Sequence, residues 1–288
     1  MSSNIKNVLI VVHPSRDDAA KFGEEIASAL TEAGFEAITN HPNLIKNALP
    51  LESSDQKIDV ALVLGGDGTI LRAAEIIRGR DIPIIGINMG SVGFLAEINR
   101  PTTNQIIEAF KNGKLNGEDR LLLNFEVIRE KEVVTTGWAL NEVTIERSGT
   151  QMVELFVQID GRPLSRWGCD GVICATPTGS TAYAFSAGGP VIWPSVSAFL
   201  FLPLAAHALF AKPMVISPKS EIGIDIESIA AEISADGMRK FSLNQGDRIN
   251  IRRDSQTMRI VHIDNGIFTD RLVAKFKLPV EGWRGQSS

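Results

Sequence analysis

The sequence contains only two cysteines among its 288 residues, Cys169 and Cys174. They lie in one apolar stretch and have no neighbouring histidine or cysteine with which to bind zinc. A chain of this length is large enough to bury a core without a disulfide. We therefore expect two buried free thiols in a reducing compartment, which is typical of a cytoplasmic protein.

Long hydrophobic runs are also missing. The apolar residues 8–12 are followed at once by His13 and Pro14, so the run is too short for the core of a signal peptide. Residues 196–211 are fewer than the roughly 20 of a membrane-spanning helix and include Pro203. We expect no membrane association, and we interpret residues 196–211 as a buried core element in which His207 lies beneath apolar neighbours.

There is no excess of positive charge. The 29 Lys and Arg face 34 Asp and Glu, for a formal net charge of −5, which gives no general attraction to nucleic acid or anionic lipid. The hydrophobic content of 44% and charged content of 22% exclude disordered, collagen-like and coiled-coil chains. The length favours two domains, and no internal repeat is present.

The first part of the chain, residues 1–120, predicts an α/β domain. A helix is expected to begin near Ser15, with Asp18 as its capping partner, and to end at Gly34. The strand, glycine loop, helix and strand of residues 59–87 form a unit that produces parallel strands. We therefore expect a doubly wound, mostly parallel sheet, with strands at 8–12, 35–39, 59–64 and 82–87 and further helices at 70–78 and 103–111.

Residues 121–267 predict a second domain of a different kind, built mostly from antiparallel β strands. Short alternating or β-branched stretches separated by tight-turn residues are typical of antiparallel strands. They occur at 121–129, 133–140, 143–147, 153–159, 172–175, 222–226 and 248–253. In the last segment, 268–288, apolar and basic residues alternate up to position 278, and we expect the segment to pack back on the first domain.

Residues 65–69 read Gly-Gly-Asp-Gly-Thr and connect a predicted strand to a helix. The glycines permit positive φ and close approach of a ligand, and the N-terminus of the helix presents free N–H groups, which suits a phosphate. A carboxylate here repels a phosphate unless it takes up a proton or holds a cation, and the loop lacks the lysine of GxxxxGK[ST] loops. These residues alone leave two interpretations of Asp67 open: a catalytic carboxylate, or a cap of the following helix.

A second polar segment follows the predicted strand 172–175. Five hydroxyl side chains occur from Thr176 to Tyr183, and Ser186 adds a sixth. They offer donors and acceptors for a sugar, a base edge or a phosphate. The alternative is a loop solvated by water. We favour a binding segment because a buried strand delivers it, and because Ala182 and the glycines leave room for a planar ring.

Three motifs, in this order along the chain, resemble those of the NAD kinase family. They are the Gly-Gly-Asp-Gly-Thr loop, the pair Asn141-Glu142, and the segment that runs from Asp170-Gly171 through Thr-Pro-Thr-Gly-Ser-Thr-Ala-Tyr to Ser-Ala-Gly-Gly-Pro. The similarity extends over nearly the whole chain. It implies an enzyme that transfers a phosphoryl group from ATP or polyphosphate to the 2′-hydroxyl of the adenosine ribose of NAD, giving NADP. It also implies that the β domain, residues 121–267, binds the dinucleotide, with the active site between the glycine loop and this domain.

The resemblance also implies roles for individual residues. Asp67 resembles the family's proton acceptor, and Arg72 resembles a basic contact near the acceptor substrate. Asn141 suits an adenine edge, Glu142 suits ribose hydroxyls or a metal, and Asp170 resembles a contact to the nicotinamide half. The other expected binding residues are Gly65, Gly66, Gly68, Thr69, Thr178, Thr181, Ala182, Tyr183, Ala184, Phe185 and Ser186.

The chain departs from the family pattern beside Asp170. Many members carry a basic residue two positions before this Asp, whereas this chain has Gly168 there and Arg166 further back. Because the glycine loop has no lysine, we expect Mg²⁺ or another divalent metal, carried mainly by the nucleotide, to neutralise phosphate charge. Pockets completed by a neighbouring subunit are common in this family, so a homodimer or homotetramer is expected.

Two other functions stay open at this point. One is a dinucleotide-sensing module that binds in the same pocket without transfer, against which the intact Asp67 weighs. The other is a lipid kinase of the diacylglycerol type, which has a related glycine loop. Asn141-Glu142 and the hydroxyl-rich segment match the dinucleotide branch instead, and the chain shows no amphipathic membrane-binding helix.

Overall fold

The computed structural model describes residues 5–90, 93–97, 99–113, 115–228, 230–263 and 267–280. The chain divides into two compact units. Unit 1 comprises Met1–Asp119 and Met258–Ser288, and unit 2 comprises Arg120–Thr257. Strands β7 (Asn116–Arg129) and β18 (Arg248–His262) each have residues in both units.

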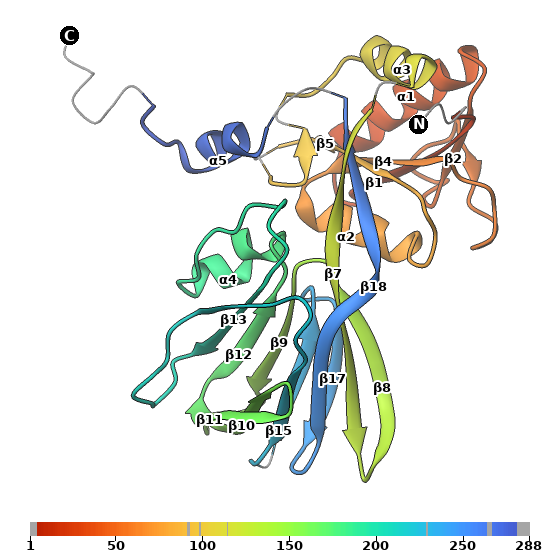
Figure 1. Ribbon diagram of the computed structural model, residues 1–288. Coiled ribbons are helices and arrows are strands. Elements are labelled where there is room, and N and C mark those ends of the chain that lie inside the picture. Colours follow the sequence, from red (N-terminus) through yellow and green to blue (C-terminus); the bar gives the residue numbers. More distant parts are fainter. Residues whose placement is uncertain are drawn as a thin grey trace. The chain divides into compact units, whose positions relative to one another are not determined.

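Unit 1 contains a parallel sheet covered by helices on both faces (Figure 1). The strand order is β18-β5-β4-β1-β2-β3, and β6 pairs with β5. Every residue of β4 and β5 is buried, as expected for strands covered on two sides. The strands are β1 (Asn7–Val12), β2 (Glu36–Thr39), β3 (Leu49–Pro50), β4 (Val60–Gly65), β5 (Ile84–Asn88), β6 (Ala96–Glu97) and the end of β18.

The helices of unit 1 are α1 (Asp17–Glu32), α2 (Asp67–Ile76), α3 (Thr103–Asn112) and α5 (Phe268–Phe276). Figure 1 shows α1 and α3 on one face of the sheet and α2 on the other, which is the doubly wound arrangement predicted from the sequence. Helix α1 ends before Gly34, whose φ is 87°. The predicted capping pair is wrong: the residue before α1 is Arg16, without a side-chain cap, and the Ser15 N–H donates instead to Nδ1 of His13 (3.2 Å).

Unit 2 is built from antiparallel strands. One sheet is six-stranded, in the order β14-β13-β12-β9-β16-β17, and the other strands pair as β11-β10-β15-β18 and β7-β8, with β7 beside β18. Trp167 and Phe201, from strands of the two different sheets, stack with ring centroids 5.9 Å apart in the core. The strands are β8 (Glu132–Ala139), β9 (Glu142–Arg147), β10 (Val153–Ile159), β11 (Arg162–Cys169), β12 (Gly171–Ala175), β13 (Phe199–Leu204), β14 (Met214–Ile216), β15 (Ile222–Ile226), β16 (Ala230–Ala235) and β17 (Arg239–Asn244).

These two architectures confirm the predicted fold class, a mostly parallel α/β part followed by a mostly antiparallel β part. One local expectation differs from the structure. The strand expected at 248–253 continues as β18 to His262, because its second half joins the parallel sheet through Ile260 and Ile84. For the segment that begins at Phe268 no secondary structure was predicted, and its residues Phe268–Phe276 form helix α5, which belongs to unit 1.

The interpretation of residues 196–211 as a buried element is only partly correct. Strand β13 is buried apart from its last residue. The chain then leaves the sheet at Ala205, which has a φ of 46°, and Leu209 and Phe210 are exposed. His207 is exposed as well, so the expectation of a buried histidine is wrong.

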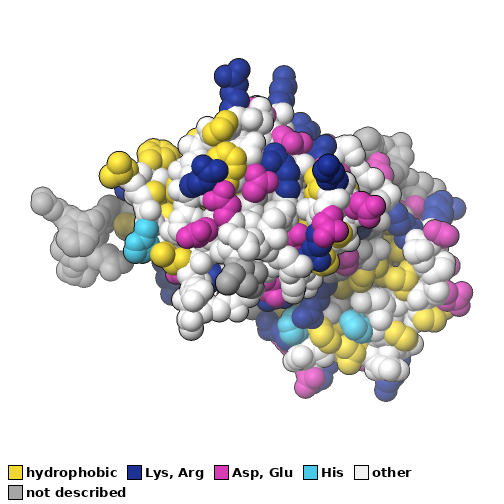
Figure 2. All heavy atoms as spheres, turned by 90° about the horizontal axis from the view of Figure 1, so that it is seen from below, with side chains coloured by type: hydrophobic (Ala, Val, Ile, Leu, Met, Phe, Trp, Pro, Cys, Tyr) yellow, Lys and Arg dark blue, Asp and Glu magenta, His cyan; other side chains and the backbone are white. Residues whose placement is uncertain are grey.

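The cysteines, the length of the helices and the surface charge can also be compared with the expectations from the sequence. Cys169 and Cys174 are both buried free thiols, as predicted, and burial raises the pKa of Cys169 to about 11. No helix within the described ranges combines the length and apolar character needed to cross a membrane. On the face of the molecule in Figure 2, acidic and basic side chains are interspersed.

Candidate functional site

In unit 1, Asp67 is the first residue of α2, and its carboxylate is held by the segment that follows β5. Oδ2 accepts the N–H of Phe94 (3.0 Å) and Oδ1 accepts the N–H of Leu95 (3.1 Å). The side chain therefore does not cap its own helix, which disfavours the capping interpretation. A carboxylate fixed by two backbone donors has a defined orientation, as a catalytic base requires.

Two glycines permit this arrangement through close approach. A Cβ on Gly93 would lie 2.3 Å from Oδ1 of Asp67, and a Cβ on Gly65 would lie 2.2 Å from Oγ1 of Thr69. Contrary to expectation, none of Gly65, Gly66 and Gly68 has a positive φ. At Gly66 and Gly68 the Cβ position is open space, so a ligand has access to the backbone at the start of α2. Arg72 is exposed on α2.

In unit 2, Asn141 lies in the turn between β8 and β9, Glu142 is the first residue of β9, and the Asp236 carboxylate holds this part of the backbone. The Asp236 carboxylate accepts the backbone N–H groups of Leu140 (3.0 Å), Asn141 (2.7 Å) and Glu142 (3.3 Å). Arg239 donates to the same carboxylate (2.7 Å). Asp236 lies in the turn between β16 and β17, and the sequence motifs gave its carboxylate no role.

The side chains of Asn141 and Glu142 have polar atoms to offer a ligand. Both are only 7% exposed, and Oδ1 of Asn141 and Oε2 of Glu142 have no hydrogen-bond partner among the described residues. Burial, together with the nearby charge of Asp236, raises the pKa of Glu142 to about 8, and the backbone N–H of Tyr183 opposes the shift. Glu142 is therefore mainly protonated at neutral pH, and it can both donate and accept a hydrogen bond.

Some hydroxyl groups of the segment from Thr176 to Ser186 make hydrogen bonds within the protein, and others are exposed and can contact a ligand. Thr176 donates to the Leu140 carbonyl (2.6 Å), and Ser180 donates to the Pro177 carbonyl (2.7 Å) while it accepts the Ile192 N–H (2.9 Å). These two hydroxyls are fully buried and fix the segment beside the Asn141 turn. Among the predicted binding residues, Ala184 is buried in an apolar cluster and Thr178 is 7% exposed, whereas Thr181 and Ala182 are half-buried and Tyr183, Phe185 and Ser186 are exposed.

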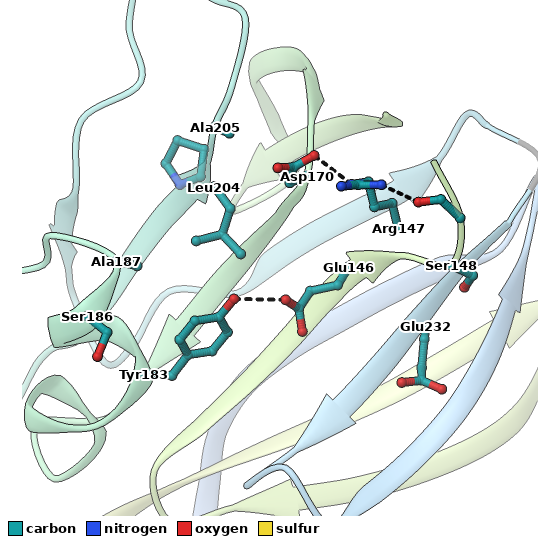
Figure 3. A pocket seen from close by; sticks show the side chains of 12 residues that line it. Glu146, Arg147, Ser148, Asp170, Tyr183, Ser186, Ala187, Leu204, Ala205 and Glu232 are labelled. Carbon is teal, nitrogen blue, oxygen red and sulfur yellow. Dashed lines mark hydrogen bonds and ion pairs between the residues drawn. The ribbon is translucent and has the colours of Figure 1, made fainter. Parts of the chain in front are cut away.

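An open pocket of about 980 Å³ lies beside this segment in unit 2 (Figure 3). Three predicted site residues line it: Asp170, Tyr183 and Ser186. The Tyr183 hydroxyl donates to Oε1 of Glu146 (2.9 Å), and burial and nearby carboxylates raise the pKa of Tyr183 to about 12. The other lining residues were not among the predicted site residues, although Ala187 belongs to the third motif: Glu146, Arg147, Ser148, Gly149, Ala187, Pro203, Leu204, Ala205 and Glu232.

Arg147 provides a cation next to Asp170 that the sequence did not predict. Its Nε lies 2.6 Å from Oδ1 of Asp170, and its guanidinium also donates to the Gly149 carbonyl (Figure 3). Arg166 instead pairs with Glu227 (3.0 Å) and lies over the ring of Phe156. Strands β9 and β12 are antiparallel, with Glu146 opposite Gly171. The next residue of β9, Arg147, therefore lies beside Asp170, and this strand pairing is the signal that could have identified it.

Within the described ranges, the acidic, histidine and cysteine side chains do not group into a site for a metal ion. Among the residues that the structure describes, no three His, Cys, Asp or Glu side chains are grouped so that they could hold a metal ion. Oε2 of Glu142, the expected candidate, has no hydrogen-bond partner among the described residues, and a role of Glu142 as a metal ligand stays a prediction. The pocket lining contains the carboxylates of Glu146, Asp170 and Glu232, which suit hydroxyl groups and cationic rings better than phosphates.

The chain matches two family models. Residues 46–115 match the ATP-NAD kinase N-terminal domain, and residues 140–263 match the ATP-NAD kinase C-terminal domain. Among curated proteins, it is 42% identical to "NAD kinase" of Leifsonia xyli, with 96% of each chain covered. It is 40% identical to "NAD kinase 2" of Streptomyces avermitilis, with 97% of each chain covered.

Two solved structures are also similar. Yeast NADH kinase complexed with NADH has a TM-score of 0.87 at 23% identity, covering 100% of this chain and 90% of that one, which is a likeness of fold. An NAD kinase from Archaeoglobus fulgidus in complex with ATP has a TM-score of 0.72 at 27% identity, covering 94% of this chain and 98% of that one.

These matches place the chain among the nucleotide-dependent phosphotransferases, with the glycine loop in the α/β unit and the polar pocket in the antiparallel unit. The chain belongs to the NAD kinase family, the enzymes that phosphorylate NAD to NADP. The family predicted from the sequence is therefore confirmed, and the lipid-kinase alternative is set aside.

Proposed function

We propose that this chain transfers the γ-phosphoryl group of ATP to the 2′-hydroxyl of the adenosine ribose of NAD, with Asp67 as the proton acceptor. In this reaction the ribose oxygen forms a bond to the γ-phosphorus, the bond from that phosphorus to the β,γ-bridging oxygen breaks, and ADP leaves. The hydroxyl proton passes to the Asp67 carboxylate. The observation that carries the assignment is the fixed orientation of this carboxylate at the open N-terminus of α2.

The pocket of unit 2 supports a role in binding the dinucleotide. The nicotinamide ring of NAD is cationic and its ribose carries hydroxyl donors, and both are complementary to the carboxylates of Glu146, Asp170 and Glu232. Oδ1 of Asn141, which has no hydrogen-bond partner in the described part of the chain, suits an adenine amino group, and the protonated Glu142 suits ribose hydroxyls. We assign Asn141 and Glu142 to the adenosine half, and Asp170, Tyr183 and Ser186 to the nicotinamide half.

In this proposal, Mg²⁺ enters as part of the substrate, bound to the phosphates of ATP. The described residues contain no cage for a resident ion, and the glycine loop contains no lysine. Inorganic polyphosphate is a second donor to test, since the open Gly66 and Gly68 backbone suits any terminal phosphate. A donor panel with NAD, in which NADP formation is followed with ATP, other triphosphates and polyphosphate, decides between them.

Asp67→Asn tests the proposed function directly, and Asp59→Asn is its matched control. Asp59 also belongs to unit 1, and its carboxylate likewise accepts two backbone N–H groups, from Lys6 (2.9 Å) and Asn7 (2.8 Å). We expect Asp67→Asn to lower NADP formation by about 10² to 10⁴ while NAD binding changes by no more than a few-fold. Asp59→Asn should retain turnover. Equal rates for the two variants would remove Asp67 from the chemistry.

We also propose that the chain self-associates and works in the cytoplasm. Leu209 and Phe210 expose apolar surface next to each other after β13, which favours burial against another copy. Light scattering of the purified protein, compared with Leu209→Ser, tests the assembly. The cytoplasmic location is consistent with two buried free thiols and with ATP and NAD as substrates.

A further inference from the structure

The C-terminal helix α5 packs against the segment that holds Asp67. Phe94, whose backbone N–H donates to Oδ2 of Asp67, has a side chain that is only 5% exposed. Its ring contacts two rings of α5, with centroid distances of 5.8 Å to Phe268 and 5.9 Å to Phe276. A segment more than 170 positions further along the chain therefore fixes the backbone donor of the proposed base.

Helix α5 is in turn attached to the parallel sheet through buried polar groups. Arg271 has no exposed surface, and its guanidinium donates to Nδ1 of His262 on β18 (3.0 Å). Oε1 of Glu97, on β6, lies 3.6 Å from the same nitrogen and accepts the N–H of Ile263 (2.6 Å). These side chains anchor the helix at its middle, between the two phenylalanines that contact Phe94.

The short segment 94–97 contacts both Asp67 and the residues that hold α5. Phe94 and Leu95 donate to Asp67, and Glu97, two residues later, joins the sheet at Ile87 and reaches His262. Displacement of α5 therefore acts on the two N–H groups that orient the carboxylate. A shift of about 1 Å in a reacting group can cost as much as 100-fold in rate.

We propose that Phe268 and Phe276 are positioning residues that orient the Asp67 carboxylate through Phe94. This inference rests on the proposed function of Asp67. It predicts that Phe268→Ala lowers kcat by about ten-fold or more while the KM values for NAD and ATP stay within about two-fold, because the change affects orientation and not binding. Phe268→Leu, which keeps an apolar side chain, should restore most of kcat.

A matched control separates positioning from loss of packing. Phe110→Ala removes another buried ring of unit 1, which packs on Phe35 of the same unit at 6.0 Å between centroids. It should lower the melting temperature as Phe268→Ala does, with kcat of the folded protein unchanged. If Phe268→Ala does not fold, Phe276→Ala, at the half-buried end of α5, is measured in its place.

A double-mutant cycle with Asp67→Asn gives the decisive readout. If the phenylalanine acts through Asp67, Phe268→Ala should have little further effect on the residual rate of the Asp67→Asn variant. An equal fold-loss in both backgrounds, or wild-type kcat in Phe268→Ala and Phe276→Ala, would overturn the inference. An Asp67→Asn variant with normal turnover would instead refute the proposed function itself, so the two failures are distinguishable.

Discussion

Nε of Arg147 lies 2.6 Å from Oδ1 of Asp170, at the wall of the unit 2 pocket. The cation that many family members place two residues before this Asp is absent here, since position 168 is glycine. Arg147 comes instead from the neighbouring strand β9. The position of Asp170 in the pocket thus depends on a residue that is distant in the sequence.

This ion pair gives the first prediction. Arg147→Met should raise the KM for NAD about five-fold and leave kcat nearly unchanged, since a partly exposed pair contributes about 1 kcal/mol. Steady-state kinetics with NAD as the varied substrate measures it. Arg166→Met is the control, because Arg166 pairs with Glu227 and does not line the pocket. The same KM in both variants would show that Arg147 does not support the binding of NAD.

The second prediction concerns the protonated Glu142. Its pKa of about 8 lies above the ordinary 4.5, so between these pH values the folded protein binds a proton that the unfolded chain has released. The stability linked to this proton is fully present below about pH 4.5 and is lost as the pH rises through about 8. Relative to Glu142→Gln, the wild-type free energy of unfolding should therefore fall with pH, by at most about 1.4 kcal/mol per unit.

Urea denaturation at several pH values between about 5 and 9 measures this difference. Glu132→Gln changes an exposed glutamate of β8 in the same unit, and its curve should run parallel to the wild type. Parallel curves for Glu142→Gln as well would mean that Glu142 has an ordinary carboxyl pKa in the folded protein.

The third prediction concerns the contact between Gly93 and Asp67. Gly93→Ala introduces a methyl group 2.3 Å from Oδ1 of Asp67, so the carboxylate must move. We expect kcat to fall by at least about ten-fold with little change in the KM for ATP or NAD. Thermal unfolding shows whether the variant is folded. Normal turnover in a folded variant would mean that the observed orientation of Asp67 is not needed.

Several strands and helices could be predicted from the sequence, because the spacing of apolar residues within each segment determines which of its faces is buried. The apolar runs of β1, β4 and β5 and the spacing of Phe22, Ile26 and Leu30 in α1 identified buried strands and a helix correctly. The length of β18 could not be predicted in this way, since its second half is stabilised by pairing with β5. Periodicity likewise gave no account of the exposed His207, because the chain leaves the sheet at Ala205.

For the candidate site as well, local sequence motifs predicted some residues and could not predict those that hold them in place. The motifs predicted Asp67, Asn141, Glu142 and Asp170 as site residues because their residue types suit the chemistry, and these roles stay predictions. The groups that hold them were missed: the N–H donors of Phe94 and Leu95, the Asp236 carboxylate beneath Asn141, and Arg147 beside Asp170. Each of these contacts joins positions more than 20 residues apart, and only the folded chain brings them together.

The most direct test of the central claim is a single-turnover experiment. ATP labelled at the γ-phosphorus is mixed with excess enzyme and saturating NAD, and label in NADP is followed by rapid quench for the wild type and for Asp67→Asn. We expect rapid label transfer by the wild type and a rate lower by about 10² or more in the variant, although both substrates remain bound. Transfer by Asp67→Asn at the wild-type rate would contradict it.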